Sequence, residues 1–299
     1  MTQRILALLV IGALLTMAGC YHPPQPKGYY GDTKTMSEVV RDINANNTGI
    51  PTIWTSHKFR ALIHDEKKNE NSVDGHGVLL FRKMHDKPDE LLLTGEAIYG
   101  KAFEIGSSSG PNAQYWVAVL PPNKTGTEWW GYYKNLGKPC VQSVPIHPDL
   151  IAEVLGVNDI DENFMRPPVP TMRFNNDRDA YMFTFNVPAG SQWVTQKEVW
   201  YDRVTKLPIL VLLFDANGRV LLRANLLDHQ ALEGAGGRKI ATHYKMFFPE
   251  TKDQFEFTLL DPALTGTDRT RRPIPREGTI QRRPVGDARE IRIDEDCGD

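Results

Sequence analysis

One stretch of the chain has the spacing of a serine nucleophile. Residues 106–110 read Gly-Ser-Ser-Ser-Gly, so they match the pattern Gly-x-Ser-x-Gly with Ser108 as the attacking group. In hydrolases that use this pattern, the serine lies on a sharp turn between a strand and a helix. Here Pro111 and Asn112 follow and lead into another apolar strand. The pattern therefore predicts a hairpin loop, and a serine hydrolase is the weakest of three functional hypotheses.

Histidines and carboxylates are the other groups that could bind a metal or move protons. A metal site needs several ligands on one face, as in the spacing His-x-x-x-His, and no two histidines have it. No glycine-rich phosphate loop precedes a predicted helix either. The candidates are scattered over strands and turns: His57, His64, His76 and His85, and Asp42, Asp65, Glu66, Asp74, Glu96 and Glu104. We expect no enzyme, no metal and no cofactor.

Cys20 offers different chemistry, the acceptance of a lipid. Arg4 and the apolar run from Ile5 to Ala18 are typical of a secretory signal. As a helix, about 14 residues span roughly 21 Å, which is too short for a hydrocarbon core of about 30 Å. Residues 17–20 (Met-Ala-Gly-Cys) resemble the lipobox of bacterial lipoproteins, with methionine in place of the usual leucine. We expect residues 1–19 to be cleaved and Cys20 to carry lipid.

The residues after Cys20 are predicted to form a tether. Segment 20–32 contains three prolines, and proline-rich sequence stays extended and does not pack into a core. Tyr21 stands where an aspartate retains enterobacterial lipoproteins in the inner membrane, so the periplasmic face of the outer membrane is favoured. The alternative is an ordinary signal peptide or an uncleaved anchor, in which Cys20 has no role.

Charge excludes a nucleic-acid partner and sets the C-terminal residues apart. The 35 basic and 37 acidic residues are interspersed and give a net charge of −2. Segment 264–299 has no aromatic residue and repeats the triplet Arg-Arg-Pro, so it is predicted to be a disordered tail. Its arginines could attract anionic lipid or a cell-wall polymer. Cys140 and Cys297 could pair in an exported protein, but a disordered tail argues against that disulfide.

Between the tether and the tail, residues 33–263 should fold as one β-rich domain. A capping box at Thr35 and Glu38 begins a helix to Ala45 with one apolar stripe. A second, short helix is predicted from His147 to Gly156, followed by an irregular connection. Alternation predicts twelve strands, at 53–64, 77–83, 91–99, 101–105, 115–120, 129–133, 181–187, 193–201, 207–214, 219–226, 239–248 and 253–260.

Two features of these strands bear on the architecture. Asn217-Gly218 predicts a hairpin with a type I′ turn, because both central residues of that turn need positive φ. Strands 115–120 and 209–214 are apolar on both faces, which in an antiparallel sheet requires cover on both sides. An apolar cavity on one side and helices or chain on the other would provide it.

The order of one helix, six strands, a short helix and six more strands resembles the LolA/LolB-like lipoprotein-carrier superfamily, the bacterial outer-membrane lipoprotein localisation factors. The most specific segment is 198–208 (Glu-Val-Trp-Tyr-Asp-Arg-Val-Thr-Lys-Leu-Pro), whose strand and Asp-x-x-Thr-x-Leu-Pro turn are similar to the second half of that family's sheet. The resemblance implies an α+β fold: a strongly curved antiparallel sheet, an incomplete barrel of about 11–12 strands, with helices covering an apolar cavity. No functional residue of the family matches a single position here.

The resemblance also implies a function. The chain would be a membrane-anchored lipoprotein that binds or transfers a lipid or an acylated protein, without catalysis. Burial yields about 0.8 kcal/mol per methylene, so a chain of about 14 carbons would gain roughly 10 kcal/mol. Another lipoprotein could be the partner. The alternative is a structural or interaction lipoprotein with a filled core. The aromatic candidates for the cavity wall are Trp116, Trp193, Trp200, Phe214 and Phe257.

Overall fold

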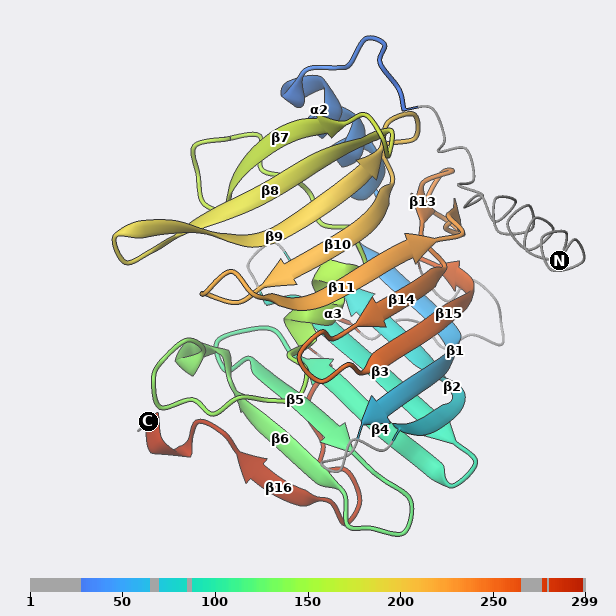
Figure 1. Ribbon diagram of the computed structural model, residues 1–299. Coiled ribbons are helices and arrows are strands. Elements are labelled where there is room, and N and C mark those ends of the chain that lie inside the picture. Colours follow the sequence, from blue (N-terminus) through green and yellow to red (C-terminus); the bar gives the residue numbers. More distant parts are fainter. Residues whose placement is uncertain (1–27, 65–69, 85–87, 265–275, 279, 298–299) are drawn as a thin grey trace, which may run out of the picture.

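The computed structural model describes residues 28–64, 70–84, 88–264, 276–278 and 280–297. Cys20, the predicted signal peptide and most of the predicted tether therefore lie outside the described residues, as do Asp65, Glu66 and His85. The described part is built around one large, curved sheet with few helices (Figure 1).

Two α-helices form as the sequence predicts. Helix α2 (Met36–Asn47) begins with the predicted capping box, in which Thr35 and Glu38 satisfy each other's backbone N–H groups. Helix α3 (Pro148–Val154) has His147 at its N-cap and proline at its first position. Two short 3-10 helices are added at Tyr133–Asn135 and Glu295–Cys297. In the described ranges, no helix is long and apolar enough to cross a membrane.

The predicted strands of the first half are all present. They are β1 (Thr52–His64), β2 (Glu70–Arg82), β3 (Glu90–Ala97), β4 (Gly100–Ser107), β5 (Gln114–Val119) and β6 (Thr127–Tyr132). Each pairs antiparallel with the next, since each connection is a hairpin. The alternation read from the sequence thus gives the correct neighbours here.

The second half adds strands that the sequence did not predict. Its strands are β7 (Val169–Asn175), β8 (Ala180–Ala189), β9 (Gln192–Asp202), β10 (Pro208–Phe214), β11 (Val220–Leu227), β12 (Gln230–Ala231), β13 (Lys239–Ile240), β14 (His243–Phe247) and β15 (Gln254–Ala263). Strand β7 was not predicted, and its first two residues fall in the proline-rich segment 158–170 that was expected to be irregular. It lies at a sheet edge, where a missing N–H is tolerated.

The hairpin at Asn217 forms with a different turn from the predicted one. Gly218 has a φ of 78°, whereas Asn217 is not among the residues with positive φ. The Gly218 N–H donates to Asp215 O at 3.0 Å, and the register shifts beside Phe214. The loop is therefore a type I turn followed by a left-handed glycine and a bulge, and the type I′ prediction is wrong.

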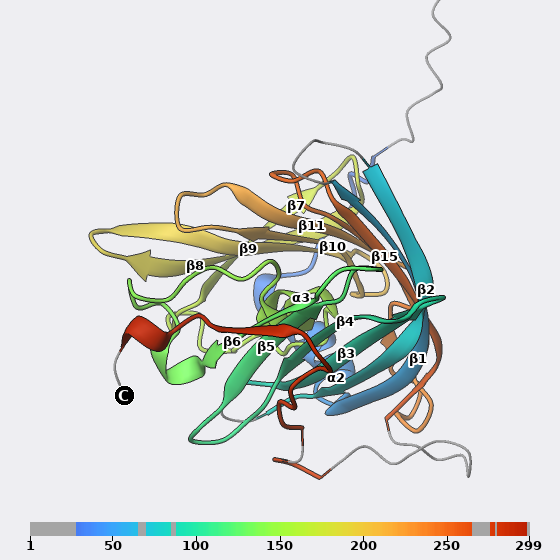
Figure 2. The same ribbon diagram turned by 90° about the horizontal axis from the view of Figure 1, so that it is seen from below.

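The sheet is open and strongly curved. In the described residues it has fourteen strands in the order β16-β6-β5-β4-β3-β2-β1-β15-β14-β11-β10-β9-β8-β7, so the two halves of the chain join where β1 pairs with β15. Figure 2 shows the sheet wrapping around α2 and α3. This confirms the predicted incomplete antiparallel barrel, with two more strands than the predicted maximum.

Two glycines let neighbouring strands approach closely. A Cβ on Gly77 would lie 1.7 Å from the backbone oxygen of Thr94, and one on Gly95 would lie 2.1 Å from the Phe103 ring. No side chain larger than hydrogen fits at either position. Glycine in a strand interior is thus required here by close packing.

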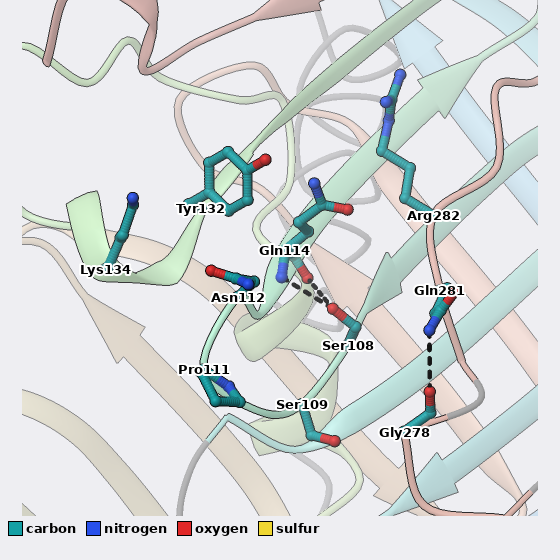
Figure 3. A pocket seen from close by; sticks show the side chains of 10 residues that line it. All are labelled: Ser108, Ser109, Pro111, Asn112, Gln114, Tyr132, Lys134, Gly278, Gln281 and Arg282. Atoms are coloured by element: carbon teal, nitrogen blue, oxygen red, sulfur yellow. Dashed lines mark hydrogen bonds between the residues drawn. The ribbon is translucent and has the colours of Figure 1, made fainter. Parts of the chain in front are cut away.

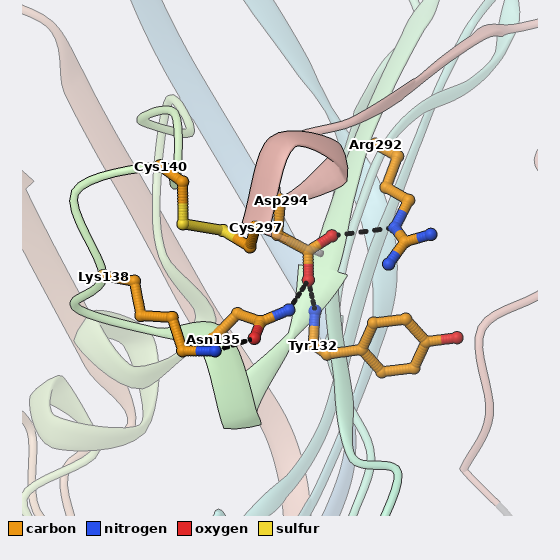
Figure 4. Close-up of a disulfide and its surroundings, with 7 residues drawn as sticks. All are labelled: Tyr132, Asn135, Lys138, Cys140, Arg292, Asp294 and Cys297. Atoms are coloured by element: carbon orange, nitrogen blue, oxygen red, sulfur yellow. Dashed lines mark hydrogen bonds and ion pairs between the residues drawn. A yellow bond between two sulfur atoms is a disulfide. The ribbon is translucent and has the colours of Figure 1, made fainter. Parts of the chain in front are cut away.

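The predicted disorder of the tail is wrong for residues 280–297. Strand β16 (Arg289–Arg292) adds to the edge strand β6 in parallel, and Cys297 forms a disulfide with Cys140 (Figure 4). Buried Asp294 accepts hydrogen bonds from the Tyr132 N–H at 3.0 Å and the Asn135 amide at 2.7 Å. Composition missed this segment because a disulfide, polar contacts and three isolated apolar side chains hold it, and no periodic apolar pattern marks it. The three apolar side chains are Ile280, Val285 and Ile293.

This C-terminal strap, the described residues 276–278 and 280–297, also covers the outer face of the sheet. Ile280 packs on wholly buried Trp116, and Arg282 forms an ion pair of 2.7 Å with wholly buried Glu128. The outer face of β5 is therefore covered by chain, while its inner face belongs to the main core. This is why strand 115–120 is apolar on both faces.

Candidate functional site

The inner face of the curved sheet and the helices beneath it form the largest apolar surface in the described residues. Strands from both halves contribute to it, and α2 covers it with buried Val39, Val40 and Ile43. Ile151 and Val154 of α3 belong to the same cluster and are 0% exposed. The space under the helices is occupied by the protein's own side chains.

Polar bonds join α2 to the segment that follows α3. The Asn44 side chain donates to the Ile160 carbonyl and accepts from its N–H, both at 2.9 Å. The Asn47 amide donates to Asn158 O at 2.8 Å, and Thr48 bonds Asp159 at 3.2 Å. We call α2, α3 and residues 155–160 the lid, because these bonds tie both helices into one cover. The two asparagines were not among the predicted site residues.

His57 is a buried polar residue on the inner face. The alternation of β1 places it in line with Ile53 and Phe59, which is the signal that could have found it. Its Nε2 lies 3.0 Å from Thr94 O and its Nδ1 has no hydrogen-bond partner among the described residues. Burial lowers the pKa of His57 from 6.5 to about 4, against the opposing effect of the Thr94 bond. The imidazole is therefore neutral at pH 7.

Tyr244 is the neighbouring polar group in this core. Its ring stacks on Phe257 with centroids 4.5 Å apart, and Phe257 is also in edge contact with His57 at 6.0 Å. The Tyr244 hydroxyl is buried without a described partner, and burial raises its pKa far above the usual value. Together, His57 and Tyr244 place two unsatisfied hydrogen-bonding atoms in the apolar interior, which is rare in folded proteins.

The five predicted aromatic residues do not share one wall. Phe257 alone lies in the inner core, where it is 1% exposed. Trp116 lies on the outer face under the strap, and its Nε1 donates to Glu104 at 3.0 Å. Trp200 donates to Glu198, Trp193 is 60% exposed at the start of β9, and Phe214 is half-buried at the end of β10.

A polar aromatic cluster lies where α3 begins. The Tyr133 hydroxyl donates to Asp149 at 2.7 Å, and the rings of Tyr115 and His147 lie 4.5 Å apart. His147 Nδ1 accepts from the Asp149 N–H at 3.3 Å as the helix cap, while its Nε2 is buried without a described partner. Burial lowers the pKa of His147. These contacts hold the start of the lid helix against β5.

The predicted serine loop does not have the arrangement of a nucleophile. The Ser108 Oγ accepts from the Gln114 N–H at 2.8 Å, and Ser109 donates to Glu90 at 2.7 Å. The hollow beside them, of about 500 Å³, is lined by no histidine (Figure 3). A hairpin loop forms at 106–110, as predicted. Among the described residues, no group of histidine, cysteine and carboxylate side chains is placed to hold a metal ion.

No family model matches the sequence, and no curated protein matches it. The structure, however, is similar to solved structures of other proteins. A domain assigned to outer membrane lipoprotein sorting, from Vibrio parahaemolyticus, is 13% identical, with 78% of this chain and 94% of that chain covered and a TM-score of 0.51. A DUF1329 family protein from Desulfovibrio piger is 10% identical, with coverage of 76% and 90% and a TM-score of 0.48.

A LolA superfamily protein from Nitrosomonas europaea is 10% identical, with coverage of 77% and 94% and a TM-score of 0.39. At these sequence identities the similarity is one of fold. The argument for it rests on the Vibrio domain, whose TM-score is 0.51. The class that this architecture defines is an open, strongly curved antiparallel half-barrel, the fold that the sequence resemblance implied.

Proposed function

We propose that this chain is a lipoprotein of the bacterial envelope that binds the acyl chain of a lipid or of an acylated protein, without catalysis. The observation that carries the proposal is the apolar inner face of the half-barrel, covered by a lid of only two short helices. The matched Vibrio domain is assigned to lipoprotein sorting, which is consistent with this ligand class.

Binding requires that α2, one part of the lid, exchange its apolar side chains for the ligand. Val39, Val40 and Ile43 are the buried apolar side chains of α2, and at about 1.5–3 kcal/mol each they contribute roughly 5–9 kcal/mol. An acyl chain of about 14 carbons gains roughly 10 kcal/mol on the same scale. Exchange of the α2 side chains for the ligand is therefore nearly balanced, so a ligand can displace α2 and be released again.

Native mass spectrometry of residues 28–299, purified from bacteria, tests the proposal together with uptake of a fluorescent fatty acid. We expect bound lipid or saturable uptake. Asn44→Ala, which loosens the lid, should raise the uptake rate. Asn175→Ala, which removes a bond from the Arg178 N–H in the turn between β7 and β8, outside the lid, should not. Absence of both bound lipid and uptake would exclude the carrier function.

We further propose that Cys20 carries the membrane anchor and that the protein faces the periplasm from the outer membrane. The lipobox-like sequence at 17–20 supports this assignment. Cys20→Ser should release the protein from the membrane fraction in a detergent partition. A Cys20→Ser protein that stays in the detergent phase would contradict the assignment.

The second candidate is an interaction lipoprotein with a permanently filled core. The observation in its favour is that wholly buried side chains, such as Phe81 and Phe183, occupy the space under the lid. It is supported if the uptake experiment fails while the protein remains folded. Ser108→Ala tests the third hypothesis, because a hydrolase would lose ester hydrolysis with this change.

A further inference from the structure

A polar hollow lies on the outer face of the half-barrel, on the opposite side of the sheet from the lid. Three segments that are distant in sequence form it: the β4–β5 loop (108–114), the end of β6 with the residues after it (132–134), and Gly278, Gln281 and Arg282 of the strap. Its volume is about 500 Å³, and polar side chains dominate its walls (Figure 3). We call it the outer hollow. The glycine-serine loop that resembles a nucleophile motif is one of its walls.

The walls of the outer hollow are held in place by buried carboxylates. Wholly buried Glu90 accepts from the Ser109 hydroxyl at 2.7 Å and from the Gly278 N–H at 2.6 Å, which ties the loop to the strap. Wholly buried Glu128 pairs with Arg282 at 2.7 Å, and the disulfide holds the far end of the strap. The hollow is thus preorganised, so a ligand need not order these segments.

Several side-chain groups in the hollow are free to bind. The Gln114 backbone bonds Ser108, and its side-chain amide lies between Tyr132 and Arg282 (Figure 3). Among the described residues, no hydrogen-bond partner is found for that amide, the Asn112 amide, the Tyr132 hydroxyl or the Lys134 ammonium. Amides and hydroxyls both donate and accept, as the hydroxyl groups of a ligand require.

The charges of the hollow leave one cation unpaired. The Arg282 guanidinium contacts both Glu128 and Glu290, and Arg292 nearby pairs with Asp294 at 3.0 Å. Lys134 forms no ion pair with a described residue and lies over the Tyr132 ring, 5.4 Å from its centroid. A phosphate dianion prefers several free cations or a free guanidinium fork, and neither is available. A single carboxylate matches the single ammonium.

We propose that the outer hollow binds a saccharide that carries one carboxylate, with Lys134 bonding the carboxylate and the amides of Asn112 and Gln114 bonding the hydroxyls. The hollow has too few apolar walls for an acyl chain, so this site is separate from the proposed lipid site. The saccharide could be a free sugar acid or part of an acidic glycan, because both present the same carboxylate and hydroxyl groups. The inference does not depend on the lid or on acyl binding.

Isothermal titration of galacturonate and galactose into the full chain, in detergent and without reductant, tests the proposal. We expect galacturonate to bind at least about tenfold more tightly than galactose, which corresponds to about 1.4 kcal/mol for one charge-assisted bond. Lys134→Met should remove this difference, and Gln114→Ala should weaken both sugars. Lys124→Met, an exposed lysine outside the outer hollow, is the matched control and should change neither.

A second titration, with polygalacturonate, distinguishes a free sugar acid from an acidic glycan as the ligand. Binding of the polymer identifies an acidic glycan, and binding of the monomer alone identifies a free sugar acid. The proposal is overturned if galacturonate does not bind at concentrations up to about 10 mM. It is equally overturned if Lys134→Met binds galacturonate as the wild type does, or if inorganic phosphate binds in its place.

Discussion

Acidification should destabilise this protein through His57. In the folded chain, burial among Phe59 and Phe257 lowers the pKa of His57 to about 4, whereas in the unfolded chain it keeps the ordinary value of 6.5. Below pH 6.5 the unfolded chain binds a proton that the folded chain does not bind until pH about 4. The free energy of unfolding should therefore fall as the pH drops from 6.5 to 4, and His57 should contribute no change above that window.

The size of the effect follows from the two pKa values. The interval between 6.5 and about 4, at about 1.4 kcal/mol per pH unit, corresponds to a loss of about 3 kcal/mol. Burial also lowers the pKa values of His147 and His229, so both act in the same direction in the wild type. The contribution of His57 must therefore be isolated by substitution.

Urea unfolding at pH 7.5 and pH 4.5 measures the contribution of His57 to the free energy of unfolding. His57→Gln keeps a donor for Thr94 O and does not titrate, so the variant should lose about 2–3 kcal/mol less than the wild type over this interval. His76→Gln is the control, because the His76 side chain is 74% exposed and its charge is the smallest of the influences on the His57 pKa; it should lose nearly as much as the wild type. Equal losses in the wild type and His57→Gln would refute the assignment of a neutral, buried imidazole.

Three further predictions concern the parts that hold the half-barrel together. Reduction of Cys140–Cys297, which closes a loop across 157 positions, should cost about 2–5 kcal/mol in urea unfolding and change tryptophan fluorescence as the strap is released; an unchanged midpoint would argue against a stabilising strap. Gly106→Ala would place a Cβ 2.2 Å from the Trp116 ring, so it should cost about 1–3 kcal/mol and alter near-ultraviolet circular dichroism; an unperturbed spectrum would contradict this packing. Asn44→Ala leaves the backbone groups of residue 160 without their partner and should cost about 1–3 kcal/mol, with faster hydrogen exchange in α2; unchanged exchange would show that the lid is held elsewhere.

Local signals predicted most elements of the fold, because they act over a few residues. The capping box at Thr35 begins α2 as predicted, and strict alternation gives the inner and outer faces of β1 and β15. The Asn217-Gly218 pair predicted the hairpin but not its turn, since the bulge beside Phe214 changes which residue needs positive φ. Strand β7 was missed because preceding prolines resemble those of a loop.

The candidate site was less predictable, because its residues meet only in the folded chain. The pairing of β1 with β15 brings His57 beside Phe257, 200 positions away, and no local pattern contains that contact. Trp116 was expected in the cavity wall, yet the alternation of β5 places it on the outer face. Which face of a two-sided apolar strand is the inner one depends on the curvature of the whole sheet.

The sequence by itself determined the class of fold, since periodicity, turn residues and element order all reflect short-range preferences of the backbone. It also supplied the expectation of a lipid anchor at Cys20, which rests on sequence alone. Only the tertiary structure decided the fate of residues 280–297. Their order depends on Cys140 and on Glu128, which are far away in the chain, so composition could not reveal it. The strap, the outer hollow and the lid exist because long-range contacts bring these residues together.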